Sequence, residues 1–248
     1  MNETRPVLNN IAAFESVLSN YHMSTHALEI LAKTNLVVLS GLAGGGRNTV
    51  INQLVATGKY HFVVSDTTRP PKLRDGKMEQ DGVAYNFRRE EDLLKGLQNG
   101  EFLEAEIIHN QQVSGISIRE LERAERTGKI AINEIEFGGI NNVASVKADV
   151  HVIGLLPPSY DIWLKRLLGR EEIHEQELLN RLHTTEKVLE NIIEKPYFRI
   201  AVNDDLAHCV AFIRRIVEDG RYSAEDTEHG LAIAKDILAK VRQRLAAA

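Results

Sequence analysis

The sequence predicts an α/β fold in which a parallel β-sheet is flanked by helices. Short runs rich in β-branched residues alternate with segments whose apolar residues recur at helical spacing. The first of these runs leads directly into a glycine-rich loop, which is typical of a connection from a strand to a helix. The chain has 248 residues, which is enough for one core domain with small inserted lobes.

Five segments are expected to be buried strands, because each is a short apolar run bounded by polar or turn residues. They are residues 36–40, 61–65, 129–135, 150–156 and 198–202. Helices are expected at residues 48–54, 118–126, 160–168, 175–194 and 207–217, where they would cover both faces of the sheet.

The two ends of the chain also show helical spacing. Residues 11–18 and 27–31 precede the first strand, and residues 223–245 follow the last one. We expect these flanking helices to serve packing or oligomerisation, and the sequence is compatible with a monomer and with a homodimer. Residues 73–82 are charged and contain glycine, which predicts a loop.

Composition and charge exclude several classes of protein. Apolar residues make up 43% of the chain and charged residues 26%, as in ordinary globular proteins. No apolar run reaches the roughly 18 residues that a membrane helix needs, and residues 1–7 lack the apolar centre of a signal peptide. We therefore expect a cytoplasmic protein with no membrane partner. The net charge of −5 gives no support for nucleic-acid binding.

Cysteine and histidine offer little chemistry. The single cysteine, Cys209, lies in an apolar helical pattern and is expected to be a small buried hydrophobic residue. None of the nine histidines falls in a metal-ligand pattern. The sequence therefore gives no candidate for a covalent nucleophile or a zinc site.

The loop after the first strand is similar to a phosphate-binding P-loop with two positions changed. In the standard pattern G-x-x-x-x-G-K-[ST], backbone N–H groups surround the phosphates, the lysine reaches the β/γ oxygens, and the hydroxyl meets Mg²⁺. Here Arg47 stands in the lysine position and Asn48 in the hydroxyl position, followed by Thr49. Arg47 keeps a positive charge and several donors, and Asn48 offers an amide oxygen. The loop predicts a nucleotide ligand.

A second group of residues is suited to another phosphate. Arg69 and Lys72 place two cations three residues apart just after a predicted strand, and Tyr85 follows them. Two cations and a phenol hydroxyl together provide the charge and the donors that a phosphate monoester needs.

Three glutamates could recognise a base. Glu104 ends the segment N-G-E-F-L-E, and Glu134 and Glu136 stand at the end of a predicted strand. Carboxylates accept hydrogen bonds from the N1–H and the exocyclic amine of guanine. Each residue alone could equally be a solvated surface charge, so the combination carries the prediction.

Taken together, these segments resemble the guanylate kinase family over about residues 35–218. The blocks that carry the resemblance occur in the family's order; they are T-T-R-P-P at 67–71, N-G-E-F-L-E at 99–104, L-P-P-S at 156–159, K-R-L-L-G-R at 165–170 and V-N-D-D-L at 202–206. The resemblance implies a P-loop parallel sheet with a small inserted nucleotide-monophosphate lobe at 66–124 and a mobile lid at 169–183. Residues 1–34 and 219–248 would then be helical extensions.

The resemblance also implies a reaction, the transfer of the γ-phosphate of ATP to GMP in the presence of Mg²⁺. The ATP-binding residues would be Gly41, Gly44, Gly46, Arg47, Asn48 and Thr49, with Asn203 beside the adenine and Asn48 at the metal. The GMP-binding residues would be Arg69, Lys72 and Tyr85 at the phosphate, Ser65, Glu104 and Glu136 at the base, and Glu134 close to the metal and phosphates. Catalysis would rest on Arg47 and on the lid arginines Arg166, Arg170 and Arg181.

The chain departs from the family pattern at the acceptor site. Lys72 stands where the family usually has arginine, and Glu134 and Glu136 stand where it usually has aspartate. The family segment Y-Y-G-[ST] corresponds here to residues 112–115, so its phosphate-binding tyrosine is absent. Ser114 and Ser117 are both candidates for its hydroxyl contact. The acceptor is therefore expected to be GMP, dGMP or a related nucleoside monophosphate.

Two other functions remain open at this point. Guanylate-kinase-like domains of scaffold proteins also have altered P-loops and bind phosphopeptides at the old GMP site. A relative in the same superfamily could phosphorylate a ribose phosphate, although Glu104 argues against that acceptor. We favour the kinase, because the acceptor cations, the paired glutamates and the lid arginines are retained together.

Overall fold

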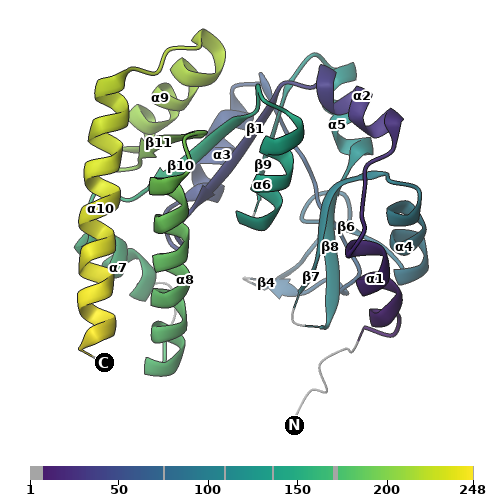
Figure 1. Ribbon diagram of the computed structural model, residues 1–248, viewed down its shortest axis with the longest axis horizontal. Coiled ribbons are helices and arrows are strands. Elements are labelled where there is room, and N and C mark those ends of the chain that lie inside the picture. The colour runs from purple at the N-terminus through teal and green to yellow at the C-terminus, as the bar shows by residue number, and fades with distance from the viewer. Residues whose placement is uncertain (1–7, 75, 109, 136, 170–172, 248) are drawn as a thin grey trace. The chain divides into compact units, whose positions relative to one another are not determined.

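The computed structural model describes residues 8–74, 76–108, 110–135, 137–169 and 173–247 (Figure 1). The chain divides into two compact units, which are described separately. Unit 1 is drawn from Met1–Asn35, His61–Ala131 and Ser145–Lys147, and unit 2 from Leu36–Tyr60, Ile132–Ala144 and Ala148–Ala248.

The central sheet has five strands in the order β11-β10-β1-β9-β2. The strands are β1 (Leu36–Gly41), β2 (Tyr60–Phe62), β9 (Ile130–Glu134), β10 (His151–Leu156) and β11 (Phe198–Val202). Strands β1 and β11 both pair in parallel with β10. All six residues of β1 are buried, as expected for the inner strand of a sheet covered on both faces. The predicted parallel α/β class is confirmed.

Among the described residues, six helices lie wholly or mostly in unit 2, and all of them except α6 match the prediction closely. They are α3 (Arg47–Ala56), α6 (Phe137–Val146), α7 (Tyr160–Leu168), α8 (Glu175–Glu194), α9 (Leu206–Asp219) and α10 (Ala224–Ala246). Helix α10 runs beside α8 (Figure 1) and packs on β11. A Cβ on Gly230 would lie 2.6 Å from the Cβ of Ile200, so this close approach of α10 to β11 requires glycine.

Unit 1 contains a smaller sheet with the strand order β6-β3-β8-β7. Its strands are β3 (Asp66–Thr67), β6 (Asn86–Phe87), β7 (Phe102–Ile108) and β8 (Gln112–Ser117), and a separate hairpin is formed by β4 (Leu73–Arg74) and β5 (Lys77–Met78). The helices are α1 (Ile11–Leu18), α2 (Thr25–Lys33), α4 (Glu90–Gln98) and α5 (Ile118–Arg126). Helix α1 packs on α4 and β7, and α2 packs on α5 and β7.

Some elements differ from the prediction. The strand expected at residues 61–65 ends at Phe62, and the expected loop at 73–82 contains the β4–β5 hairpin. The small sheet, α4 and α6 were not predicted. Strands β3 and β6 have two residues each, so pairing with distant segments defines them rather than local periodicity. Helix α6 contains two glycines and two asparagines, which are weak helix formers.

Among the residues that the structure describes, there is no helix with the length and apolar character needed to cross a membrane.

Candidate functional site

The glycine-rich loop of unit 2 joins β1 to α3 and has a backbone that only glycine adopts easily. Gly44 has φ 81° and Gly46 has φ 93°, both in the left-handed region. A Cβ on Gly46 would lie 2.5 Å from Asn203 Nδ2. Gly46 is the N-cap of α3 and provides no side-chain cap. The first N–H groups of α3 therefore remain available to an anionic ligand.

Two side chains hold the carbonyl groups of this loop. The indole Nε1–H of Trp163 donates to Ala43 O at 2.9 Å, and Asn203 Nδ2 donates to Gly45 O at 2.9 Å. Trp163 is fully buried, and Asn203 is 7% exposed. These bonds fix the orientation of the peptide groups in the loop. Asn203 was predicted to lie beside the adenine, whereas Trp163 was not predicted, because the local sequence does not show which distant carbonyl an indole will contact.

A cavity of about 180 Å³ lies against the loop in unit 2, and Arg47, Asn48, Glu134 and Arg181 line it. Arg47 Nε lies 3.3 Å from Glu134 Oε2. Arg181 Nε lies 3.1 Å from the carboxylate of Glu177 one turn earlier in α8. The cavity thus combines a helix N-terminus, two guanidinium groups, one carboxylate and one amide oxygen. This arrangement suits a polyphosphate chain.

The same cavity has oxygen groups suited to Mg²⁺. Mg²⁺ is usually held by one or two carboxylates together with substrate phosphates and waters, rather than by a cage of protein ligands. The Glu134 carboxylate and the Asn48 amide fit this pattern. Over the described part of the chain, no cluster of three or more histidine, cysteine, aspartate or glutamate side chains could hold a metal ion alone.

A second and larger cavity of about 660 Å³ also lies against the loop, at Gly44 and Gly46. Its size is in the range of small-molecule and cofactor sites. Of the predicted residues, it is lined by Gly44, Gly46, Thr49, Arg166 and Asn203. Thr49 therefore faces a different cavity from Asn48. Arg166 Nη1 donates to Asn203 O at 2.9 Å, which joins α7 to the end of β11.

Further residues of the larger cavity were not predicted; they are Ile162, Lys165, Gly169, Asp204 and Leu206. Four of them belong to two of the family blocks: Lys165 and Gly169 to K-R-L-L-G-R, and Asp204 and Leu206 to V-N-D-D-L. Block membership was therefore a usable signal, but it does not say which side chains face the cavity.

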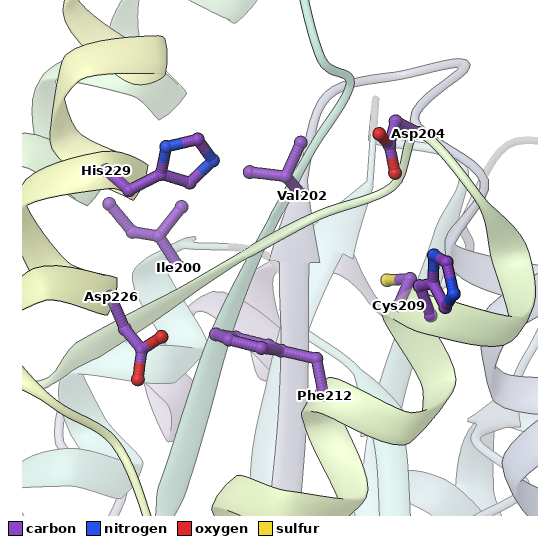
Figure 2. Close-up of a pocket in the computed structure, with 8 residues that line it drawn as sticks. Ile200, Val202, Asp204, Cys209, Phe212, Asp226 and His229 are labelled. Atoms are coloured by element: carbon purple, nitrogen blue, oxygen red, sulfur yellow. The ribbon is translucent and has the colours of Figure 1, made fainter.

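A third cavity of about 200 Å³ lies between β11, α9 and α10 and shares Asp204 with the larger cavity. Figure 2 shows Ile200 and Val202 on the strand, with Phe212 and Cys209 on α9. Burial raises the pKa of the Cys209 thiol to about 12, so the thiol stays protonated at neutral pH. The prediction that this cysteine is a small buried hydrophobic residue is confirmed.

In unit 1, Arg69 lies in a closely packed group with Tyr85. Its guanidinium forms two bonds with the carboxylate of Glu79, at 2.5 and 3.0 Å, and lies over the Tyr85 ring at 4.6 Å. Arg69 is only 5% exposed. The bond to Glu79 holds the pKa of Arg69 above its ordinary value. The backbone N–H of Lys72 also donates to Glu79, at 3.0 Å.

The structure therefore brings the guanidinium of Arg69 and the ring of Tyr85 together, and Glu79 links Arg69 to the backbone of Lys72. Glu79 was not predicted, because it follows Arg69 by ten residues within a segment expected to be a loop. The β4–β5 hairpin brings Glu79 back beside Lys72, and Glu79 N–H donates to Lys72 O at 2.9 Å. The pairing of Glu79 with Arg69 therefore follows from the hairpin and not from the local sequence.

The residues predicted to contact a base lie on or beside the small sheet of unit 1. Ser65 precedes β3, and its carbonyl accepts from Asn86 N–H at 2.9 Å. Glu104 lies on β7 opposite Ile116. A Cβ on Gly115 would lie 2.5 Å from Glu104 O, so glycine is required where β8 passes Glu104.

Ser114 and Ser117 have different roles in this sheet. The Ser114 hydroxyl donates to Thr67 Oγ1 at 2.8 Å, which ties β8 to β3. Ser117 is the N-cap of α5 and accepts from Arg119 N–H at 3.3 Å. Ser117 thus serves the helix, whereas Ser114 lies between strands.

A buried carboxylate supports the start of this sheet. Asp66 accepts from Arg119 Nη2 at 3.0 Å and from Asn86 Nδ2 at 2.9 Å. Burial raises the pKa of Asp66, although these partners oppose the change. Asp66 follows Ser65 directly, so its bonds fix the backbone beside a predicted base contact. Local sequence gave no sign of this role.

Two predicted residues, Glu136 and Arg170, lie outside the described residues.

Comparisons with known proteins agree with these observations. Residues 33–220 match the family model described as Guanylate kinase. The guanylate kinase of Corynebacterium diphtheriae is 34% identical over 73% of this chain and 93% of that protein. That of Methylobacillus flagellatus is 31% identical over 78% of this chain and 93% of its own. The crystal structure of the guanylate kinase from Anaplasma phagocytophilum has a TM-score of 0.53 and 22% identity, covering 78% of this chain and 89% of that one. This last likeness concerns the fold.

Proposed function

Because the chain belongs to the guanylate kinase family, we propose that it transfers the γ-phosphate of ATP to GMP and releases ADP and GDP. The observation that carries this proposal is the cavity in which the N-terminus of α3, Arg47, Arg181 and Glu134 meet. Phosphoryl transfer depends on positioning and on neutralising negative charge. This cavity supplies both.

Unit 2 provides the donor side of the reaction. The N–H groups at the start of α3 hold the phosphate oxygens, and the guanidinium groups of Arg47 and Arg181 neutralise their charge. When phosphate binds Arg47, it competes with the Glu134 carboxylate for that guanidinium. Glu134 is then free to hold Mg²⁺. When bound there, Mg²⁺ would supply positive charge that helps to neutralise the phosphates.

The adenosine part of ATP is assigned to the larger cavity. This cavity adjoins the loop through Gly44 and Gly46, so a nucleotide whose phosphates lie at the N-terminus of α3 can extend into it. Asn203 and Asp204 supply polar groups there. We assign Arg166, which lines the same cavity, to the phosphate oxygens of ATP.

Unit 1 provides the acceptor side. Arg69, Lys72 and Tyr85 bind the phosphate of GMP, and Glu79 keeps Arg69 in position. Lys72 gives a single point of positive charge where an arginine would give a fork of donors. Ser65 and Glu104 contact the guanine base. An acceptor phosphate oxygen is already ionised, so the attack needs no protein nucleophile or general base.

The retained donor side is the reason to prefer a kinase over a phosphopeptide-binding module. A module that uses only the acceptor site has no need for Arg47, Arg181 and Glu134 around one cavity. Glu104 supports a base-containing acceptor over a ribose phosphate. We place the reaction in the cytoplasm, where both nucleotides are available.

The experiment that tests the function is a coupled assay of ADP release with ATP and Mg²⁺ against GMP, dGMP, AMP, UMP and CMP. We expect turnover that is selective for GMP or dGMP. The variant Arg47→Ala should lower kcat by about 10²–10³, the usual effect of removing one group that stabilises the transition state. The exposed residue Arg221 provides the matched control, since Arg221→Ala should keep wild-type activity. Absence of turnover with all five acceptors would contradict the proposal.

A further inference from the structure

Residues 8–32 precede the region that matches the family model, yet they form part of the core of unit 1. Phe14 of α1 is fully buried and packs, with Leu8, against Leu93, Leu97 and Phe102. Helix α1 lies beside α4 (Figure 1). Asn10 N–H donates to the carboxylate of Glu90 in the first turn of α4, at 2.9 Å. This N-terminal segment is therefore an integral layer of the unit that carries the acceptor residues.

Tyr21, between α1 and α2, binds both backbone polar groups of a single strand residue. Its hydroxyl donates to Phe102 O at 2.6 Å and accepts from Phe102 N–H at 2.8 Å. Phe102 is the first residue of β7, which is an edge strand of the small sheet. An edge strand leaves its outward N–H and C=O groups without a neighbouring strand. The Tyr21 hydroxyl takes the place of that strand at Phe102.

The bonds of Tyr21 lie immediately before an irregularity in the register of β7. Phe102 pairs with Ser117, whereas Glu104 pairs with Ile116, the next residue along β8. Leu103 is thus the extra residue of a β-bulge. A bulge redirects the side chains that follow it, and a slip of one residue moves each side chain to the opposite face of a sheet. The direction of Glu104 therefore depends on this bulge.

The turn before β7 is held by the same segment. Ser24 N–H donates to Gly100 O at 3.0 Å. Gly100 has φ 69°, and a Cβ on it would lie 2.5 Å from Ser24 N, so the close approach requires glycine. The N-terminal segment therefore contacts the chain at Gly100, four residues before the predicted base contact Glu104, and again at Phe102, two residues before it.

The Tyr21 hydroxyl keeps its proton under physiological conditions. Burial raises the pKa of Tyr21 to about 12, and Glu101 adds to this effect. A protonated hydroxyl can donate to the Phe102 carbonyl and accept from its N–H at the same time.

We propose that Tyr21 is a positioning residue for acceptor specificity, whose hydroxyl holds the bulge at Leu103 and thereby directs Glu104 toward the guanine base. The proposal rests on the proposed function, in which Glu104 contacts the base. Without the hydroxyl, the Phe102 groups lose their partner and the bulge can shift. The donor residues of unit 2 are untouched by this change, so the loss should appear in GMP recognition rather than in the transfer step.

The test is steady-state kinetics of the full-length variant Tyr21→Phe with GMP and with IMP, which lacks the exocyclic amine of guanine. We expect KM for GMP to rise about tenfold, the effect of losing roughly one hydrogen-bonded contact. We expect the preference for GMP over IMP to fall similarly, while kcat and KM for ATP stay within about twofold. The matched control is Tyr197→Phe, which removes a hydroxyl bonded to Asn141 in unit 2 and should leave GMP recognition unchanged.

A companion variant separates this inference from the function itself. If Glu104→Gln loses the preference for GMP while Tyr21→Phe keeps it, the role of Tyr21 is overturned and the kinase assignment stands. An equal fall in kcat with GMP and IMP, together with a lower Tm, would show that Tyr21 serves stability alone and would also overturn the inference. Absence of GMP turnover in the wild type would remove the proposed function, and the inference with it.

Discussion

At the residue scale, Arg69 is bound by a protein carboxylate at the position assigned to the acceptor phosphate. Both Arg69 and Glu79 are nearly fully buried, with side-chain exposures of 5% and 6%. Removing one partner of a buried ion pair leaves an uncompensated charge, which commonly costs about 3–5 kcal/mol. We therefore expect Glu79 to affect the stability of unit 1 and, under the proposed function, the orientation of Arg69 toward the acceptor phosphate.

This arrangement predicts the effect of Glu79→Gln. The amide keeps the shape but not the charge, so we expect a higher KM for GMP and a lower urea midpoint, while KM for ATP changes little. Steady-state kinetics and urea unfolding measure these quantities. Glu91→Gln, at an exposed position of α4, is the control. A fall in KM for GMP would instead mean that Glu79 competes with the acceptor phosphate, and it would contradict the positioning role.

A second residue-scale prediction concerns pH. Glu218 accepts from Arg214 Nε at 2.7 Å and also contacts Lys59 and Tyr60. Chiefly through the Arg214 bond, the pKa of Glu218 falls from 4.5 to about 2. Because the folded-state pKa is lower than the unfolded one, this carboxylate stabilises the fold above pH 4.5, and the contribution is lost as pH falls toward 2.

The variant Glu218→Gln should therefore unfold at a lower urea concentration at pH 7, and the difference from wild type should shrink between pH 4.5 and pH 2. The expected size at neutral pH is about 1–3 kcal/mol, as for hydrogen bonds to charged groups. Glu228→Gln, at an exposed position, is the control. A difference that stays constant over this pH range would contradict the assignment.

The site residues show which parts of a site can be predicted from sequence. Arg47, Asn48, Arg69 and Tyr85 lie within or close to recognisable blocks, and the structure places the first pair in one cavity and the second pair in contact. The supporting residues Glu79, Trp163 and Tyr21 act through partners that are distant in sequence or outside the family blocks. Their roles depend on tertiary contacts, which local patterns do not encode.

At the element scale, helix α10 and strand β11 meet at a contact that admits no side chain. The Cβ of an alanine at position 230 would lie 2.6 Å from the Cβ of Ile200, which is anchored in the central sheet. In the interior of a helix, alanine is usually more stabilising than glycine by about 1 kcal/mol. Overpacking a well-packed contact typically costs about 1–3 kcal/mol. We therefore expect the steric cost of the added methyl group to exceed its gain in helix propensity.

We therefore predict that Gly230→Ala lowers the free energy of unfolding by about 1–2 kcal/mol. Chemical denaturation of the variant and the wild type measures the difference. Glu228→Ala tests helix propensity alone at a nearby exposed position of α10 and should be neutral or slightly stabilising. A Gly230→Ala variant as stable as Glu228→Ala would contradict the packing account.

The same scale shows why some elements could be predicted and others could not. The five strands of the central sheet and long helices such as α8 have clear apolar periodicity, and their predicted bounds differ from the observed ones by a few residues at most. Strands β3 and β6 are too short for any period, and α6 is rich in glycine and asparagine. These elements exist because distant segments pair or pack with them.

At the scale of the whole molecule, the residues of the proposed reaction divide between the two units. Unit 2 carries the glycine-rich loop and its arginines, and unit 1 carries the residues assigned to the acceptor phosphate. Both flanking segments belong to these units, since α1 and α2 pack within unit 1 and α10 packs within unit 2. One of the two roles expected for the flanks, packing, is therefore confirmed, and oligomerisation stays a prediction.

The transfer of phosphate from ATP to GMP is tested by following the γ-phosphate itself. ATP labelled with ³²P at the γ-position is incubated with the full-length protein, Mg²⁺ and GMP, and the nucleotides are then separated. We predict that the label moves to GDP, in an amount equal to the ADP formed, and that Arg69→Ala abolishes this transfer. Label that remains in ATP, or that appears as inorganic phosphate whether or not GMP is present, would contradict this prediction.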